Sequence, residues 1–152
     1  MQFLDAALGR GTPLVLALLI GSWLALPAHP ARGRVVVTES ETTILDVVEF
    51  DEGTATLRPT SQPILDAVAA TLLGNPSIRL VEVQSHTGRI GDHTANLALS
   101  MQRAEVVMAY LVHAGVESSR LVAQGYGDTQ PIDPAIPAKN ERVSFLILTR
   151  NP

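Results

Sequence analysis

One stretch of this sequence constrains the fold more than any other: a polar turn that leaves an apolar strand and leads into a long helix. The turn occupies residues 85–91 and contains two glycines, Gly88 and Gly91. The helix is predicted over about residues 94–114, because an apolar stripe follows helical spacing at Leu97, Met101, Ala104, Met108 and Leu111, with Val107 beside it. The helix places one basic residue, Arg103, back near the polar turn.

Four short segments predict strands. Residues 44–50 are expected to form the first strand and residues 142–148 the last, with a short strand over residues 120–126 between them. Residues 78–84 are apolar on both faces, which is typical of an interior strand covered on both sides.

A second helix is predicted between the first two strands. It begins near Pro63, where Thr60 or Ser61 can cap it, and Gly74 marks its end. Alternating strands and helices predict an α/β (α+β) sandwich, in which about four strands form a mixed sheet and two or more helices pack on it.

The N-terminal residues 1–31 differ from the rest of the chain. The uncharged apolar run over residues 14–26 would span about 20 Å as a helix, which is short of the roughly 30 Å hydrocarbon core of a bilayer. We expect a secretory signal that is cleaved or, alternatively, an uncleaved membrane anchor; a buried helix of the domain is a third option. Residues 32–43 are predicted as a short linker and residues 44–150 as one domain.

Composition excludes several classes of function. The charged fraction is 17% and the net charge is −4, whereas a nucleic-acid-binding protein needs a basic stripe. The chain has no cysteine, so it has neither disulfides nor thiolate metal sites. His86 and His93 do not make a metal cluster, and no residue is placed to orient His86 toward Ser100 as a nucleophile. We therefore expect no metal, no cofactor and no enzymatic activity.

Several short motifs resemble, in order and spacing, the OmpA-like domain, which also occurs in peptidoglycan-associated lipoproteins and flagellar stator proteins. The resemblance extends from residue 44 to about residue 149. The motifs that carry it are Phe50-Asp51, Ser85-His86-Thr87, Asn96-x-x-Leu99-Ser100-x-x-Arg103-Ala104, Gly125-Tyr126-Gly127-Asp128 and Asn140-x-Arg142-Val143.

This resemblance implies a βαβαβ-type domain of the periplasm or outer membrane that binds the peptide stem of peptidoglycan, without catalysis, and tethers a membrane or a partner protein to the wall. The ligand end is meso-diaminopimelate, which carries an ammonium and a carboxylate on one carbon. In the family an aspartate of the turn takes the ammonium and a helix arginine takes the carboxylate. Here Arg103 matches that arginine, and its planar fork suits a carboxylate. The resemblance assigns further ligand-binding positions to Phe50, Asp51, Thr87, Gly88, Asn96, Leu99, Asn140 and Arg142.

The chain departs from the family where the acid is expected. Gly88 stands at the aspartate position, and Ser144 stands where a second acid is usual. A charge-assisted hydrogen bond contributes ~1.5–3 kcal/mol, so its loss predicts binding weaker by roughly 10- to 150-fold. Asp92 or Asp51 could substitute from a neighbouring loop. The alternative is a degenerate domain that has lost its ligand and serves as a protein–protein interaction module.

Overall fold

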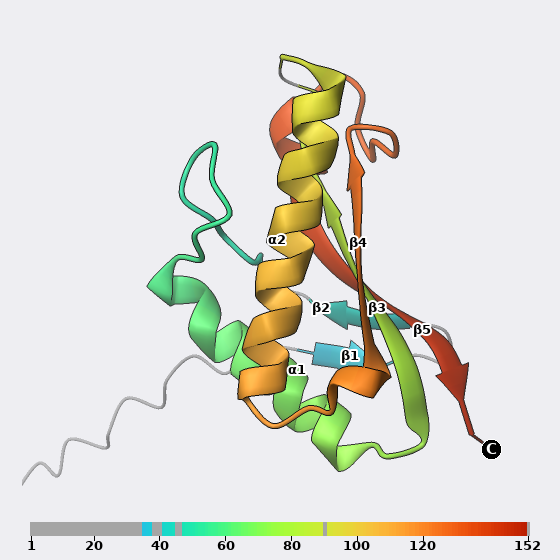
Figure 1. Ribbon diagram of the computed structural model, residues 1–152. Coiled ribbons are helices and arrows are strands. Elements are labelled where there is room, and N and C mark those ends of the chain that lie inside the picture. Colours follow the sequence, from blue (N-terminus) through green and yellow to red (C-terminus); the bar gives the residue numbers. More distant parts are fainter. Residues whose placement is uncertain (1–34, 38–40, 45–46, 90, 152) are drawn as a thin grey trace, which may run out of the picture.

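The computed structural model describes residues 35–37, 41–44, 47–89 and 91–151 of the chain (Figure 1). Its strands are β1 (Val35–Val37), β2 (Glu41–Ile44), β3 (Ile78–His86), β4 (Leu121–Gly127) and β5 (Arg142–Arg150). Its helices are α1 (Gln62–Gly74) and α2 (His93–His113), with short 3-10 turns η1 (Pro59–Ser61), η2 (Ser118–Arg120) and η3 (Pro137–Asn140). The signal or anchor predicted over residues 1–31 lies outside the described residues. Within those ranges, no helix is long and apolar enough to cross a membrane.

The strands form one mixed sheet in the order β1-β2-β5-β3-β4 (Figure 1). β3 and β4 run parallel, whereas β3 with β5, β5 with β2 and β2 with β1 are antiparallel. The predicted mixed α/β architecture is therefore present, but the sheet has five strands rather than about four. The additional pairing comes from β1 and most of β2, which lie in the segment that the sequence predicts as a linker.

The strand predicted over residues 44–50 is wrong for most of its length. Only Ile44 belongs to β2, and Phe50 makes an isolated bridge to Leu57. The backbone of Glu49 instead bonds to the start of the first helix: its N–H donates to the hydroxyl of Ser61 at 2.7 Å, and that hydroxyl donates to its carbonyl at 3.0 Å. Backbone groups used in this way are not available to a sheet ladder. The same contact explains why Ser61 does not cap α1 with its side chain.

Both helices pack on one face of the sheet (Figure 1). The fully buried core includes Leu65, Val68 and Leu72 of α1, Val107 and Leu111 of α2, Val81 and Val83 of β3, and Phe145 of β5. The opposite face of β3 is not covered as predicted, since Glu82 and Gln84 are half-buried and hydrogen-bonded there to each other at 2.8 Å. β3 is thus an interior strand with one apolar and one polar face.

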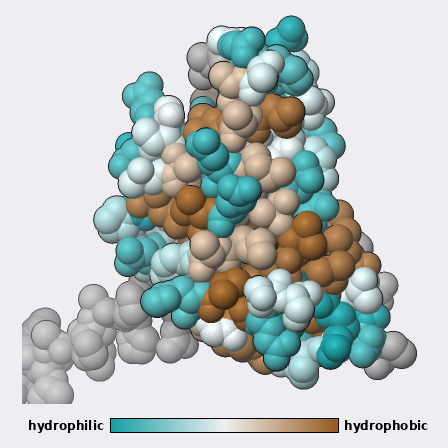
Figure 2. Space-filling view, viewed as in Figure 1, coloured by the Kyte–Doolittle hydropathy of each residue, from teal (hydrophilic) through white to brown (hydrophobic). Residues whose placement is uncertain are grey.

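The predicted stripe of α2 is buried at Ala104, Val107 and Leu111, but toward the N-terminus the buried face is shifted by about one residue. Leu97 is 42% exposed, whereas Asn96 and Ser100 are buried, so the N-terminal half of the helix turns polar residues inward. Figure 2 shows the outer face of the helices, where apolar residues lie over the middle of the surface and hydrophilic residues at the upper end.

Candidate functional site

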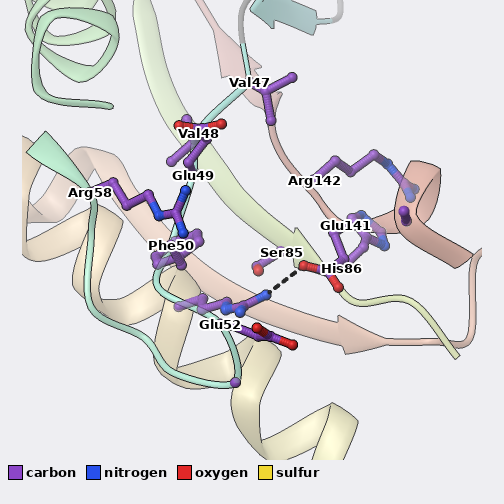
Figure 3. Close-up of a pocket in the computed structure, with 13 residues that line it drawn as sticks. Val47, Val48, Glu49, Phe50, Glu52, Arg58, Ser85, His86, Glu141 and Arg142 are labelled. Carbon is purple, nitrogen blue, oxygen red and sulfur yellow. Dashed lines mark hydrogen bonds and ion pairs between the residues drawn. The ribbon is translucent and has the colours of Figure 1, made fainter. Parts of the chain in front are cut away.

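A pocket of about 300 Å³ lies at the end of the sheet where β3 ends and β5 begins (Figure 3). It is bordered by the loop before α1, by η3 and by the middle of α2. The residues that line it are Val47, Val48, Glu49, Phe50, Glu52, Gly53, Arg58, Ser85, His86, Arg103, Ala138, Glu141 and Arg142. Charged side chains therefore reach the pocket from three separate parts of the chain.

The position of α2 beside the pocket depends on two glycines in β4. A Cβ on Gly125 would collide with the backbone nitrogen of Met101, and a Cβ on Gly127 would lie 3.0 Å from the helix backbone. Ser100 holds this close approach, because its hydroxyl accepts the N–H of Gly127 at 2.8 Å. One turn further along the helix, Arg103 reaches the floor of the pocket.

Arg103 is 5% exposed and has three kinds of contact. Its Nε donates to the carbonyl oxygen of Thr54 at 2.8 Å, and its guanidinium carbon lies 4.8 Å from the centre of the Phe50 ring. Its Nη1 lies 3.5 Å from a carboxylate oxygen of Glu141, a contact drawn as the dashed line in Figure 3. A cation held by a backbone carbonyl and an aromatic face keeps a fixed orientation and retains donors for an anion.

Three glutamates line the same pocket. The carboxylate of Glu49 accepts the hydroxyl of Thr60 at 2.9 Å, whereas Glu52 is exposed and makes no hydrogen bond or ion pair within the described ranges. The side chain of Glu141 is 46% exposed at the rim, above the buried Arg103. The pocket thus offers both signs of charge.

The β3 end of the pocket contains buried polar groups without partners. His86 is 2% exposed and stacks on Tyr126 with ring centres 5.1 Å apart. Burial, reinforced by the nearby charge of Arg142, lowers the pKa of His86 to about 4, so its imidazole is neutral at pH 7. Neither ring nitrogen is hydrogen-bonded, and the same holds for the hydroxyl of Ser85. Unpaired buried polar groups typically cost ~1–3 kcal/mol each, which makes this end of the pocket a poor contributor to stability.

The structure brings three of the sequence-predicted site residues into this pocket, namely Phe50, Arg103 and Arg142. Arg142 is half-buried and donates to the carbonyl oxygens of Asn140 and Gln130 at 3.3 and 3.2 Å. Burial lowers the pKa of Arg142. Arg142 is therefore a fixed part of the wall.

The other predicted site residues lie outside this pocket. Thr87 and Asn140 line a separate cavity of about 90 Å³, and Asn140 uses its amide to hold the preceding loop, accepting the N–H groups of Ile132 and Asp133 at 2.8 and 2.9 Å. Asn96 is buried with its amide nitrogen unpaired, and Leu99 is half-buried on α2.

Gly88 is also buried outside the pocket. A Cβ at this position would lie 2.7 Å from the carbonyl oxygen of Pro137 and 3.0 Å from its carbonyl carbon. Those atoms are backbone, so the first residue of η3 occupies the space that a side chain at position 88 would need.

The two aspartates expected to replace the missing acid are placed elsewhere. Asp51 pairs with Arg58 at 3.4 Å at the surface, and Asp92 caps α2 by accepting the N–H of Ala95 at 2.9 Å. Ser144 faces the polar side of the sheet, where its hydroxyl donates to Gln84 at 3.1 Å. Its lack of charge therefore does not change the pocket.

Sequence reasoning missed the acids that do line the pocket, Glu141 above all. Glu141 occupies the variable position of the motif Asn140-x-Arg142. The sequence could have indicated this acid only through its place between two motif residues. The two histidines considered for a metal are separated, since His93 contacts Asp128 at the surface while His86 lies in the pocket. Among the described residues no group of three or more His, Cys, Asp or Glu side chains could hold a metal ion.

Comparison with known proteins identifies the family of this chain. The model of the OmpA family matches residues 49–143. The probable lipoprotein YiaD of Escherichia coli K12 is 40% identical over 85 residues, which cover 56% of this chain and 38% of that protein. The peptidoglycan-binding protein ArfA of Mycobacterium tuberculosis is 33% identical over 129 residues, which cover 81% of this chain and 39% of that protein. This chain thus spans about two fifths of the length of these relatives.

A solved structure shares the fold. The peptidoglycan-associated lipoprotein from Burkholderia pseudomallei matches with a TM-score of 0.57 and 28% identity, covering 81% of this chain and 97% of that chain.

Proposed function

Since this chain belongs to the OmpA family, we propose that it is a non-catalytic binding module of the bacterial cell envelope, which holds the peptide stem of peptidoglycan at its diaminopimelate end. The similarity to the peptidoglycan-binding protein ArfA and to the peptidoglycan-associated lipoprotein of Burkholderia supports this assignment. Arg103 is the residue that takes the ligand carboxylate.

The observation that carries the proposal is the environment of Arg103. A guanidinium that is 5% exposed has lost most of its hydration, and its one acidic neighbour is 3.5 Å away. Its Nε donates to the carbonyl oxygen of Thr54 and its Nη1 to Glu141, so the guanidinium keeps N–H groups without a partner among the described residues. A planar carboxylate is the group that such a fork binds best, because two parallel hydrogen bonds can form.

The other predicted residues have supporting roles in this proposal. The ring of Phe50 packs against the guanidinium of Arg103 and orients it, and Arg142 forms part of the pocket wall. Asn140 fixes the loop that leads into β5, whereas Asn96, Leu99 and Thr87 lie outside the pocket, on α2 and in the turn before it. Asp51 shapes the loop around Phe50 rather than meeting the ligand.

We place the binding domain, residues 44–150, outside the cytoplasm, in the periplasm or at the outer membrane. In this arrangement residues 1–31 act as a leader or as an anchor, and contact with a membrane comes only through them. Binding to the wall then tethers the membrane, or a partner protein of the envelope, to peptidoglycan.

Calorimetric titration of the full chain with a stem peptide that contains meso-diaminopimelate tests the proposal. Replacing Arg103 by Met removes the cation but keeps a flexible apolar stem, and we expect binding weaker by roughly 10- to 150-fold. Arg79→Met is the matched control, because Arg79 is exposed near the start of β3, at the other end of the strand. Circular dichroism of each variant checks that it is folded. Equal binding by both variants would contradict the role of Arg103.

The second candidate function is that of a protein–protein interaction module, and Gly88 favours it. If the wild type does not bind the stem peptide although it is folded, the pocket has lost its ligand and this alternative stands. Binding by the wild type that depends on Arg103 excludes it as the principal function.

A further inference from the structure

The pocket cannot receive an acid from position 88. Gly88 does not line it, and any side chain there would meet the backbone of Pro137 at 2.7 to 3.0 Å. The acid that a zwitterionic ligand needs must therefore come from another element. This question rests on the proposed function, because it concerns the ligand of the same site.

Only one carboxylate of the pocket lies next to the buried cation. Glu49 accepts the hydroxyl of Thr60, and Glu52 makes no hydrogen bond or ion pair with Arg103. Glu141 lies with its carboxylate 3.5 Å from the guanidinium, its side chain 46% exposed against 6% for Arg103. The anion is thus at the rim and the cation at the floor, and both are accessible from the same space.

The Arg103–Glu141 pair is short enough for a zwitterion on one carbon to lie beside it, since its charged atoms are 3.5 Å apart. In such a group the nitrogen and the carboxylate carbon are about 2.5 Å apart, from two bonds of about 1.5 Å at a near-tetrahedral angle. A ligand end that lies antiparallel to the Arg103–Glu141 pair sets four charges of alternating sign at the corners of a quadrilateral. Each charge then has two opposite neighbours, and the existing ion pair need not break.

The remaining charges of the pocket are compatible with a neutral ligand end. Its lining contains Arg58, Arg103 and Arg142 together with Glu49, Glu52 and Glu141, so the formal charges cancel. A ligand that carries only a negative charge would be repelled by Glu141, and one that carries only a positive charge would be repelled by Arg103. Such a pocket favours a group that carries both charges.

The geometry points to Glu141 as the acceptor of the ligand ammonium, so that Arg103 and Glu141 together form a two-charge site for the zwitterionic end of the stem peptide. Glu141 is a specificity residue in this scheme. It distinguishes diaminopimelate from side chains that carry only one of its two charges.

Three probes and two variants of the full chain test this inference by calorimetry. The probes are a stem peptide with meso-diaminopimelate, the same peptide without the distal amine, and the same peptide with lysine. Glu141→Gln is expected to weaken binding of the first probe by roughly 10- to 150-fold. Binding of the amine-free probe should stay within about threefold of wild type or become tighter. The reason is that the variant lacks the Glu141 carboxylate, which competes with the ligand carboxylate for Arg103. Glu105→Gln, at an exposed position of α2 outside the pocket lining, is the matched control and should leave all affinities within about threefold of wild type.

Three outcomes overturn the assignment of Glu141. The first is that Glu141→Gln binds the diaminopimelate peptide as the wild type does. The second is that it loses the amine-free probe equally, which would indicate a structural role. The third is that the control Glu105→Gln shows the same selective loss. A wild type that binds none of the probes overturns the proposed function, and this inference with it.

Discussion

The two ends of the interface between α2 and the sheet differ in chemistry. Toward the C-terminus of α2, Val107 and Leu111 are fully buried among apolar neighbours that include Phe145. Toward the N-terminus, the buried residues of the helix are polar, with Ser100 and Arg103 among them. One helix therefore serves a dry core at one end and a charged pocket at the other.

The apolar end of this interface stabilises the fold, whereas the polar end lowers the stability. Burial of apolar surface contributes roughly 25 cal/mol per Å², so the apolar end supports the fold. At the polar end, Ser85 and His86 have buried polar atoms without partners, and Gly125 must stay without a side chain to let the helix approach. Arrangements that lower stability are usually retained for function.

The largest effect is expected at the apolar end. Phe145→Ala should lower the free energy of unfolding by about 3–5 kcal/mol, because it leaves a cavity among fully buried side chains. Urea denaturation measures this change, with Leu148→Ala on the same strand as the control, since Leu148 is 46% exposed. A loss below about 1 kcal/mol would mean that this end of the interface is loosely packed.

An intermediate effect is expected from His86 and depends on pH. The pKa of His86 is about 4 in the folded chain against 6.5 for a solvated histidine, so between these values the unfolded chain binds a proton that the native chain does not. The free energy of unfolding should therefore fall as pH drops from 6.5 to 4, by at most about 3 kcal/mol at 1.36 kcal/mol per pH unit.

His86→Phe removes this titration while keeping an aromatic ring beside Tyr126. Chemical denaturation at several pH values between 4 and 6.5 should show a flatter profile for the variant than for the wild type. His113→Ala, at an exposed position, is the control. Parallel profiles of wild type and His86→Phe would contradict a buried neutral histidine.

The smallest change in the free energy of unfolding is expected from substitutions of Ser100 and Ser85, two serines of the polar end. Ser100→Ala removes a hydroxyl that accepts the buried N–H of Gly127, and should cost about 1–3 kcal/mol. Ser85→Ala removes a hydroxyl without a partner, and the free energy of unfolding should change by less than about 1 kcal/mol or rise. Urea denaturation of the pair compares them directly, and a loss at Ser85 as large as that at Ser100 would show that the polar end is better satisfied than its geometry indicates.

Elements with a strong local signal are well predicted from the sequence. The two helices begin and end within a few residues of their predicted bounds, because periodic apolar residues and the residues at their ends act locally. The final strand begins at Arg142, as predicted, and extends two residues beyond its predicted end, to Arg150. The strand predicted over residues 44–50 failed because Ser61, distant in sequence, takes the backbone groups of Glu49.

For the candidate site, the sequence predicted some of the residues but not their arrangement. The motif around Arg103 correctly indicates a cation near the turn after β3, yet it misses Glu141, since no local pattern reveals which acid a loop carries to the same rim. It also could not reveal that Asp51 and Asp92 are engaged elsewhere. Such pairings depend on the paths of loops, which have no periodicity to read.

The sequence by itself determined the family, the two helices and the order α1, β3, α2, β4 and β5, because hydrophobic spacing and short motifs are properties of adjacent residues. The tertiary structure alone decided which charges meet. It set Glu141 beside Arg103 and closed the space at Gly88 with the backbone of Pro137. Both are contacts between segments far apart along the chain, and their geometry follows from how closely the backbones of α2, β4 and η3 pack.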